Sequence, residues 1–169
     1  LAKALDAFGV DFIEAGHPAV SETIREAVTA IQALGLKARV IAHARATRQD
    51  VEAAARCGVS WVGIFCGVNR YTLECKLRMT KPQALKHIVE AIRVAKSLGL
   101  HVRYSCEDAT RTDLSGLLDA YRRAIEAGAD RISLVDTVGV LTPRRTFGLV
   151  RWLTEACSVP LHIHCHNDL

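Results

Sequence analysis

Short apolar runs alternate with longer amphipathic runs along the whole chain. The short runs are rich in β-branched and aromatic residues and predict strands at 11–16, 37–43, 61–67, 101–107, 131–137 and 161–167. The longer runs predict helices at 21–34, 47–57, 81–98, 112–127 and 142–157. Repeated strand–helix units of this kind form a parallel sheet.

Glycine and capping residues mark the corners between these units. Each of the first five strands follows a helical run that ends in Gly, as in "ALGLK" and "SLGLH", and Gly just past a helix end favours a left-handed cap. Several helical runs begin with Ser, Thr or Asp, and Thr142 followed by Pro143 suits a helix start.

Two parallel arrangements suit this order, an open doubly wound sheet and a (β/α)8 barrel. The barrel is favoured because no GxGxxG follows a strand, and because most strands carry polar residues at their carboxyl ends. A complete barrel needs about 200 residues or more, and the chain opens inside the helix-like run "LAKALDAFG". We therefore expect residues 1–169 to form one partial TIM-barrel catalytic domain of about six βα units, without the first strand and C-terminal unit(s).

Composition narrows the functional classes. Half of the residues are hydrophobic and the net charge is +4, without the clustered basic residues that nucleic acid requires. No apolar run approaches the ~20 residues of a membrane span, and no secretory leader pattern opens the chain. The six cysteines form no CxxC pair, so we expect reduced core thiols in a cytoplasmic protein. Residues 68–82 form the longest irregular stretch and predict a mobile active-site loop.

The final stretch "LHIHCHNDL" places His162, His164 and His166 at alternate positions. Alternate residues of a strand point the same way, with Cα atoms ~6.6–7 Å apart, so His164 and His166 can converge on one cation. Histidines that fill a polar core are the alternative. Because the pair stands at the carboxyl end of a strand, before Asn167 and Asp168, we favour a metal site.

A second polar face lies on the predicted strand 101–107. Arg103, Ser105 and Glu107 alternate with Tyr104 and Cys106, so they share one face while the other two pack against helices. A buried guanidinium is costly unless it is paired or binds an anion, and its planar fork suits a substrate carboxylate. An internal Arg103–Glu107 salt bridge is the alternative.

Further polar residues stand at other strand ends. Asp136 and Thr137 end one strand, and His43 and Glu14 belong to two others. Thr137 can donate a hydrogen bond to a carboxylate, whereas Asp136 suits either a helix cap or a supporting role. Together these groups predict an active site at the carboxyl ends of the strands.

Three motifs, "RYSCEDATRTD", "LVDTVGVLTPR" and "HCHND", carry a resemblance that runs through the whole chain. The chain resembles the metal-dependent TIM-barrel acyltransferases that include homocitrate synthase and 2-isopropylmalate synthase, relatives of hydroxymethylglutaryl-CoA lyase. The resemblance implies condensation of acetyl-CoA with a 2-oxo acid, a divalent metal (Zn, Mn or Mg) and a homodimer.

The resemblance also implies roles for particular residues. His164 and His166 would bind the metal, and Glu107 would work beside the catalytic base. The residues implied to contact the substrate are Arg103, Ser105, Thr137 and His43. For His43 the resemblance also implies a catalytic role. The family's first strand, with its metal-binding acid, and the base from a dimer partner have no counterpart here, so we expect the isolated chain to be inactive.

The order "RxSxED" favours homocitrate synthase, which acts on 2-oxoglutarate. Synthases of 2-isopropylmalate or citramalate remain the nearest alternatives, and a lyase of the hydroxymethylglutaryl-CoA type ranks below them. A non-catalytic fragment is the remaining alternative, because an incomplete barrel exposes its sheet edges.

Overall fold

One curved sheet of parallel strands organises the molecule. The computed structural model describes residues 1–167, and its strands follow one another in the sheet in chain order. The strands are β1 (Phe12–Gly16), β2 (Arg39–Arg45), β3 (Trp61–Phe65), β4 (His101–Cys106), β5 (Arg131–Asp136) and β6 (Leu161–Cys165). The main helices are α1 (Ala2–Phe8), α2 (Glu22–Gln32), α3 (Arg48–Arg56), α4 (Lys81–Ser97), α5 (Leu114–Glu126) and α6 (Pro143–Ala156).

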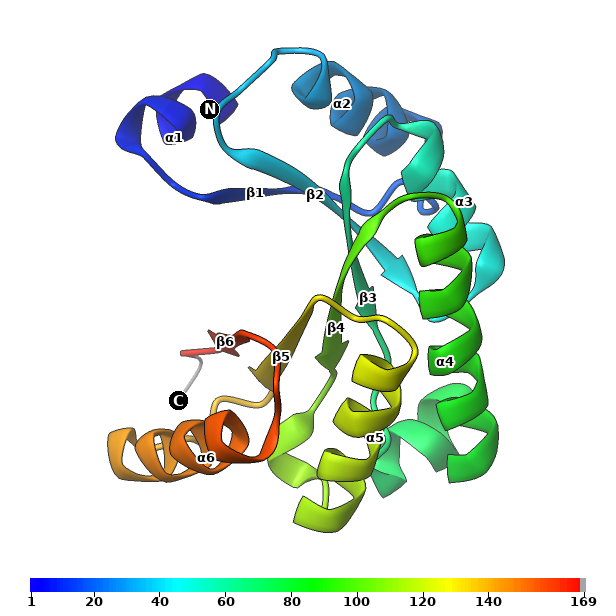
Figure 1. Ribbon diagram of the computed structural model, residues 1–169, viewed down its shortest axis with the longest axis vertical. Coiled ribbons are helices and arrows are strands. Elements are labelled where there is room, and N and C mark those ends of the chain that lie inside the picture. Colours follow the sequence, from blue (N-terminus) through cyan, green and yellow to red (C-terminus); the bar gives the residue numbers. More distant parts are fainter. Residues whose placement is uncertain (168–169) are drawn as a thin grey trace.

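The sheet curls, and helices α2 to α6 cover its outer face (Figure 1). Strands β1 and β6 form the two ends of this curved sheet, and the inner face opens to the side between them. The incomplete TIM barrel that the sequence predicts is confirmed.

Capping residues define the ends of the helices as predicted. The side chains of Ser21, Thr47, Thr80, Asp113 and Thr142 each accept a hydrogen bond from a backbone N–H three residues further along. The glycines at the predicted corners all have left-handed φ angles; they are Gly9, Gly35, Gly58, Gly99 and Gly128. Local sequence therefore sets where each strand–helix unit turns.

The two faces of each strand separate the core from the cavity. In β4, Val102, Tyr104 and Cys106 are fully buried on the outer side, where helices α4 and α5 pack. Tyr104 satisfies its hydroxyl by donating to the carbonyl of Cys66 at 2.8 Å. Arg103 and Ser105 take the alternate, inner positions, as predicted.

The segment 68–82 differs from the prediction of an irregular loop. It contains a π-helical turn, η1 (Thr72–Leu77), which begins beside the buried Asn69. The Asn69 side chain accepts a hydrogen bond from the backbone N–H of Thr72 and donates one to its hydroxyl. This capping stabilises a helical turn where composition alone suggested none; the predicted mobility stays a prediction.

All six cysteines are free thiols, but they are not all core residues. Cys57, Cys66 and Cys106 are buried as expected, whereas Cys75 and Cys165 are exposed. Burial raises the pKa of Cys106 to about 12, so its thiol stays protonated at neutral pH. Among the described residues, no helix has the length and apolar character that crossing a bilayer requires.

A buried carboxylate ties three segments together near the start of α3. Asp50 is 1% exposed and accepts two hydrogen bonds from the Arg45 guanidinium, at 2.7 and 2.9 Å. Its oxygens also contact His17 at 2.8 Å and the Thr47 hydroxyl at 3.1 Å. Burial alone would raise the pKa of Asp50, but the Arg45 and His17 hydrogen bonds lower it to about 2.

We expect Asp50→Asn to lower the free energy of unfolding at pH 7 by about 2 kcal/mol, since a pKa lowered from 3.8 to about 2 corresponds to that amount. The folded-state pKa lies below the ordinary value. The contribution is therefore full above about pH 4 and is lost as the pH falls towards 2. Urea titrations at pH 7 and pH 3 should show a smaller difference at pH 3, and equal differences would contradict this account. The control is Asp119→Asn, in an exposed pair with Arg123, with an expected change under about 0.5 kcal/mol.

Candidate active site at the carboxyl ends of the strands

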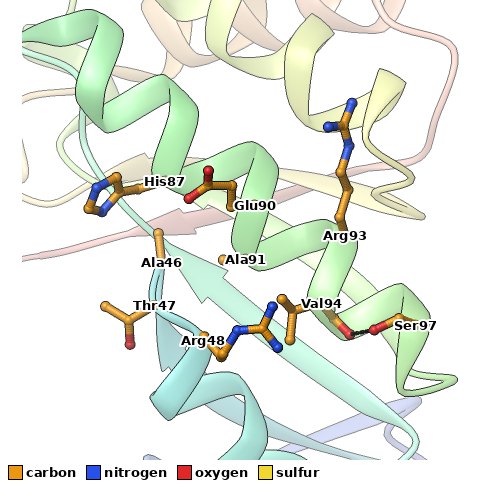
Figure 2. Close-up of a pocket in the computed structure, with 9 residues that line it drawn as sticks. All are labelled: Ala46, Thr47, Arg48, His87, Glu90, Ala91, Arg93, Val94 and Ser97. Carbon is orange, nitrogen blue, oxygen red and sulfur yellow. Dashed lines mark hydrogen bonds between the residues drawn. The ribbon is translucent and has the colours of Figure 1, made fainter.

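Two cavities are candidates for the functional site. A cavity of about 630 Å³ lies on the outside, between the start of α3 and α4. Figure 2 shows that its polar side chains do not converge: Arg93 points away from the groove, and His87 points away from Glu90. This outer groove therefore lacks the arrangement that catalysis or tight polar binding requires.

The second cavity, of about 270 Å³, lies on the inner face of the sheet. It contains every side chain that the sequence singled out for catalysis, substrate or metal. Its lining consists of Glu14, His43, Phe65, Arg103, Ser105, Glu107, Ser133, Val135, Thr137, His162, His164 and His166. All six strands contribute to this lining through their inward positions, and Glu107, Thr137 and His166 follow strand ends, which is where barrel active sites lie.

A carboxylate from β1 holds together the basic side chains of this cavity. Nη2 of Arg103 lies 2.6 Å from Oε1 of Glu14, and Nε2 of His43 lies 3.1 Å from Oε2 of the same carboxylate. The hydrogen bond from His43 and the charge of Arg103 outweigh burial, and they lower the pKa of Glu14 far below its ordinary value. Glu14 therefore stays ionised, and its negative charge offsets the positive charge of the Arg103 guanidinium.

The sequence alternative of an Arg103–Glu107 salt bridge is wrong. Arg103 reaches across the inner face to Glu14, and Glu107 instead pairs with Lys76 of η1, at 2.6 and 2.8 Å from Nζ. Arg103 is 6% exposed, and its Nε–H has no partner among the described residues. A buried donor without a partner is unusual, and it marks a position where a ligand oxygen can bind.

Hydroxyl groups extend the polar lining. The Thr137 oxygen accepts a hydrogen bond from the backbone N–H of Asp108 at 2.8 Å, which leaves the hydroxyl proton of Thr137 to be donated. Ser133 contacts Nδ1 of His162 at 2.7 Å. Burial first, and then the charge of Arg103, lower the pKa of His162, so its ring is neutral at pH 7.

His164 on β6 and His166, just after this strand, are spaced as two ligands of one cation. Nε2 of His164 lies 3.3 Å from Nε2 of His166. Two nitrogens that are each about 2.0–2.2 Å from a metal lie about 3–3.5 Å apart at common coordination angles. The two residues therefore fit a divalent metal. Within residues 1–167, no group of three His, Cys, Asp or Glu side chains could complete such a site. Asp168 of the "HCHND" motif lies outside the described residues.

Several polar residues near the site have structural roles. Asp136 is buried and accepts hydrogen bonds from the backbone N–H groups of Val140 and Leu141. Burial would raise the pKa of Asp136, but these hydrogen bonds hold it below its ordinary value. Of the two roles left open for Asp136, the helix cap is wrong, because Thr142 is the N-cap of α6; Asp136 instead supports the loop after β5. Arg111 pairs with Asp108 and so braces the loop after β4.

Sequence reasoning missed two partners in this site. The sequence pattern places Glu14 on a strand without predicting a role for it, and it predicts no role for Lys76. Lys76 and Glu107 are 31 residues apart, and Arg103 and Glu14 are further apart still. An inward position on β1 was the available signal for Glu14, whereas no local pattern points to Lys76.

Comparisons with known proteins agree with this architecture. The chain is 44% identical over 169 residues to a protein named homocitrate synthase from Pyrococcus abyssi, covering 100% of this chain and 46% of that protein. It is 43% identical over 168 residues to a protein named probable 2-isopropylmalate synthase from Methanopyrus kandleri, covering 99% of this chain and 34% of that protein. The chain thus spans less than half the length of these relatives.

Solved structures share the fold. The crystal structure of an HMG-CoA lyase from Bacillus subtilis superposes with a TM-score of 0.76 at 18% identity, covering 95% of this chain and 58% of that one. The family model described as HMGL-like matches residues 1–169. The family match agrees with the barrel architecture and the polar cavity, and the chain belongs to the HMGL-like family.

Proposed function

We propose that the chain forms the substrate-binding part of an acyltransferase that condenses acetyl-CoA with a 2-oxo acid and then releases CoA. One observation carries the proposal: a buried guanidinium, donor hydroxyls and a metal-spaced histidine pair line the same cavity. An anionic substrate that also chelates a cation requires this combination. The names of the relatives, homocitrate synthase and 2-isopropylmalate synthase, support the reaction class.

Arg103, Ser105 and Thr137 bind the carboxylates of the 2-oxo acid in this proposal. The guanidinium of Arg103 has an unpartnered Nε–H, and it can form charge-assisted hydrogen bonds to a carboxylate. Thr137 donates its hydroxyl proton, since its oxygen already accepts a hydrogen bond from the chain. Together these donors fix the orientation of the ketone.

His164 and His166 are the proposed ligands of the divalent metal, which, when bound, supplies Lewis-acid polarisation of the ketone. His43 is oriented by Glu14 and contacts the substrate. Glu107 is held by Lys76 and acts beside the base that removes a methyl proton from acetyl-CoA. We place that base outside this chain, in the partner subunit of a homodimer.

A 2-oxo dicarboxylic acid such as 2-oxoglutarate is the substrate that we favour, as in homocitrate synthase. Arg103 is buried beside one protein carboxylate, that of Glu14, and its remaining N–H groups can bind the remote carboxylate of a dicarboxylic substrate. The similarity to a relative named 2-isopropylmalate synthase keeps a branched 2-oxo acid as the second candidate.

Substrate choice is tested in a polypeptide that carries the whole barrel, by thiol release from acetyl-CoA. We expect turnover with 2-oxoglutarate and little with 2-oxoisovalerate or pyruvate. Arg103→Met should raise KM for 2-oxoglutarate about 10–100-fold, because it removes charge-assisted hydrogen bonds. Arg122→Met, at an exposed position of α5, is the matched control. Turnover with 2-oxoisovalerate but none with 2-oxoglutarate would overturn the homocitrate assignment.

The ligand assignment is tested by metal analysis of the same polypeptide. The double variant His164→Ala/His166→Ala should lose most of its Zn, Mn or Mg, because each imidazole supplies one ligand nitrogen. His87→Ala, in the outer groove, is the control and should keep its metal. Undiminished metal content in the double variant would refute the assignment.

The 169-residue chain by itself should show no measurable condensation. Its described residues supply two of the expected metal ligands, and the proposed base lies elsewhere. The assay is thiol release with acetyl-CoA and 2-oxoglutarate at high protein concentration. Turnover by the isolated chain would contradict this prediction and show that residues 1–169 suffice for catalysis.

A further inference from the structure

The inner face of β3 has a gap between two aromatic side chains. Trp61, Gly63 and Phe65 occupy successive inward positions, whereas Val62 and Ile64 are fully buried on the outer side. Gly63 is itself buried and lies in the middle of a central strand. Glycine weakens a strand interior, and its presence there often marks a close approach by another group.

The backbone does not require glycine at this position. Gly63 is not among the glycines with left-handed φ angles, in contrast to Gly128, whose φ is 108°. An alanine at position 63 would therefore meet no backbone strain. The reason for glycine must lie in the space that a side chain would occupy.

That space is taken by the basic groups of the active site. Gly63 is paired with His43 on one side and Arg103 on the other, in one row across β2, β3 and β4. A Cβ atom on Gly63 would lie 3.3 Å from Nη2 of Arg103 and 3.4 Å from Nδ1 of His43. The contact with Arg103 is tight for a carbon atom, so the guanidinium would have to move by a few tenths of an ångström, whereas the contact with His43 is close to an ordinary van der Waals distance.

Nη2 of Arg103 is also the atom that binds Glu14, at 2.6 Å. Arg103 stands on β4 and Glu14 on β1, so the arginine side chain must extend past β3 to reach its partner. A side chain at position 63 would stand against this atom. The absence of a side chain at position 63 therefore leaves space for the Arg103–Glu14 pair.

We propose that Gly63 is a specificity-determining position, which leaves room for the Arg103 guanidinium and thereby selects a 2-oxo acid with a second carboxylate. The proposal rests on the function proposed above. A methyl group at position 63 would push the guanidinium by a few tenths of an ångström. A branched side chain at position 63 would displace the guanidinium from Glu14. The cavity surface there would become apolar instead of cationic and would favour a 2-oxo acid with an apolar tail.

The first experiment measures substrate choice in the polypeptide that carries the whole barrel. Gly63→Val should raise KM for 2-oxoglutarate about 10–100-fold, as expected when charge-assisted hydrogen bonds are lost. KM for acetyl-CoA should change little, because the 2-oxo acid is the one of the two substrates that is proposed to contact the guanidinium. Gly63→Ala should give an intermediate effect, and it keeps the proposal testable if the valine variant does not fold. The control is Gly148→Ala on α6, where an added Cβ has no atom within 4 Å.

The second experiment does not depend on catalysis. Carbon-13 NMR of the Glu14 carboxyl group follows its titration in wild type, Gly63→Ala and Gly63→Val. The pKa of Glu14, lowered by its contacts with His43 and Arg103, should rise towards the ordinary value in the valine variant. In Gly148→Ala it should stay at the wild-type value.

The two experiments separate the possible failures. An unchanged pKa of Glu14 in Gly63→Val, or equal KM changes for both substrates, would overturn the role of Gly63. Wild-type enzyme without turnover on 2-oxoglutarate would refute the homocitrate assignment. In that case the titration of Glu14 still decides whether Gly63 leaves room for the Arg103–Glu14 pair.

Discussion

The guanidinium of Arg103 lies inside the curved sheet with little access to water, and an unpaired cation in such a place costs several kcal/mol. Glu14 removes most of this cost by direct contact at 2.6 Å, and it orients His43 at the same time. The arrangement of the inner face follows from this requirement. His43 and Arg103 stand in one row on β2 and β4, Glu14 contacts both of them from β1, and β3 must leave space between them.

Parallel pairing makes this possible. In-register neighbours on parallel strands point into the same cavity, so a row such as His43, Gly63 and Arg103 forms without any bend in the chain. The outer positions of the same strands are apolar and pack against the helices, which holds the register. Packing of the outer face and polar chemistry on the inner face are thus two consequences of one alternating pattern.

The loops after the strands add the remaining groups. Lys76 reaches Glu107 from the π-helical turn after β3, and Asp108 fixes the Thr137 hydroxyl from the loop after β4. These contacts join neighbouring loops to each other as well as to the cavity. Changes in one loop are therefore expected to alter the orientation of side chains in the next. A fold shared with HMG-CoA lyase at 18% identity shows the scaffold, whereas these side chains carry the chemistry.

The amino-acid sequence alone determined the strand–helix order, the glycine and N-cap corners, the barrel class and most of the polar residues that face the cavity. These properties depend on local propensity and on alternation, which can be read within a few residues. The tertiary structure decided which charges pair: Arg103 with Glu14 rather than Glu107, and Glu107 with Lys76. It also decided that residues 72–77 form a helical turn and why position 63 is glycine. Such contacts join residues that are distant in the chain, and the curvature of the sheet, which no local pattern encodes, sets the distance between them.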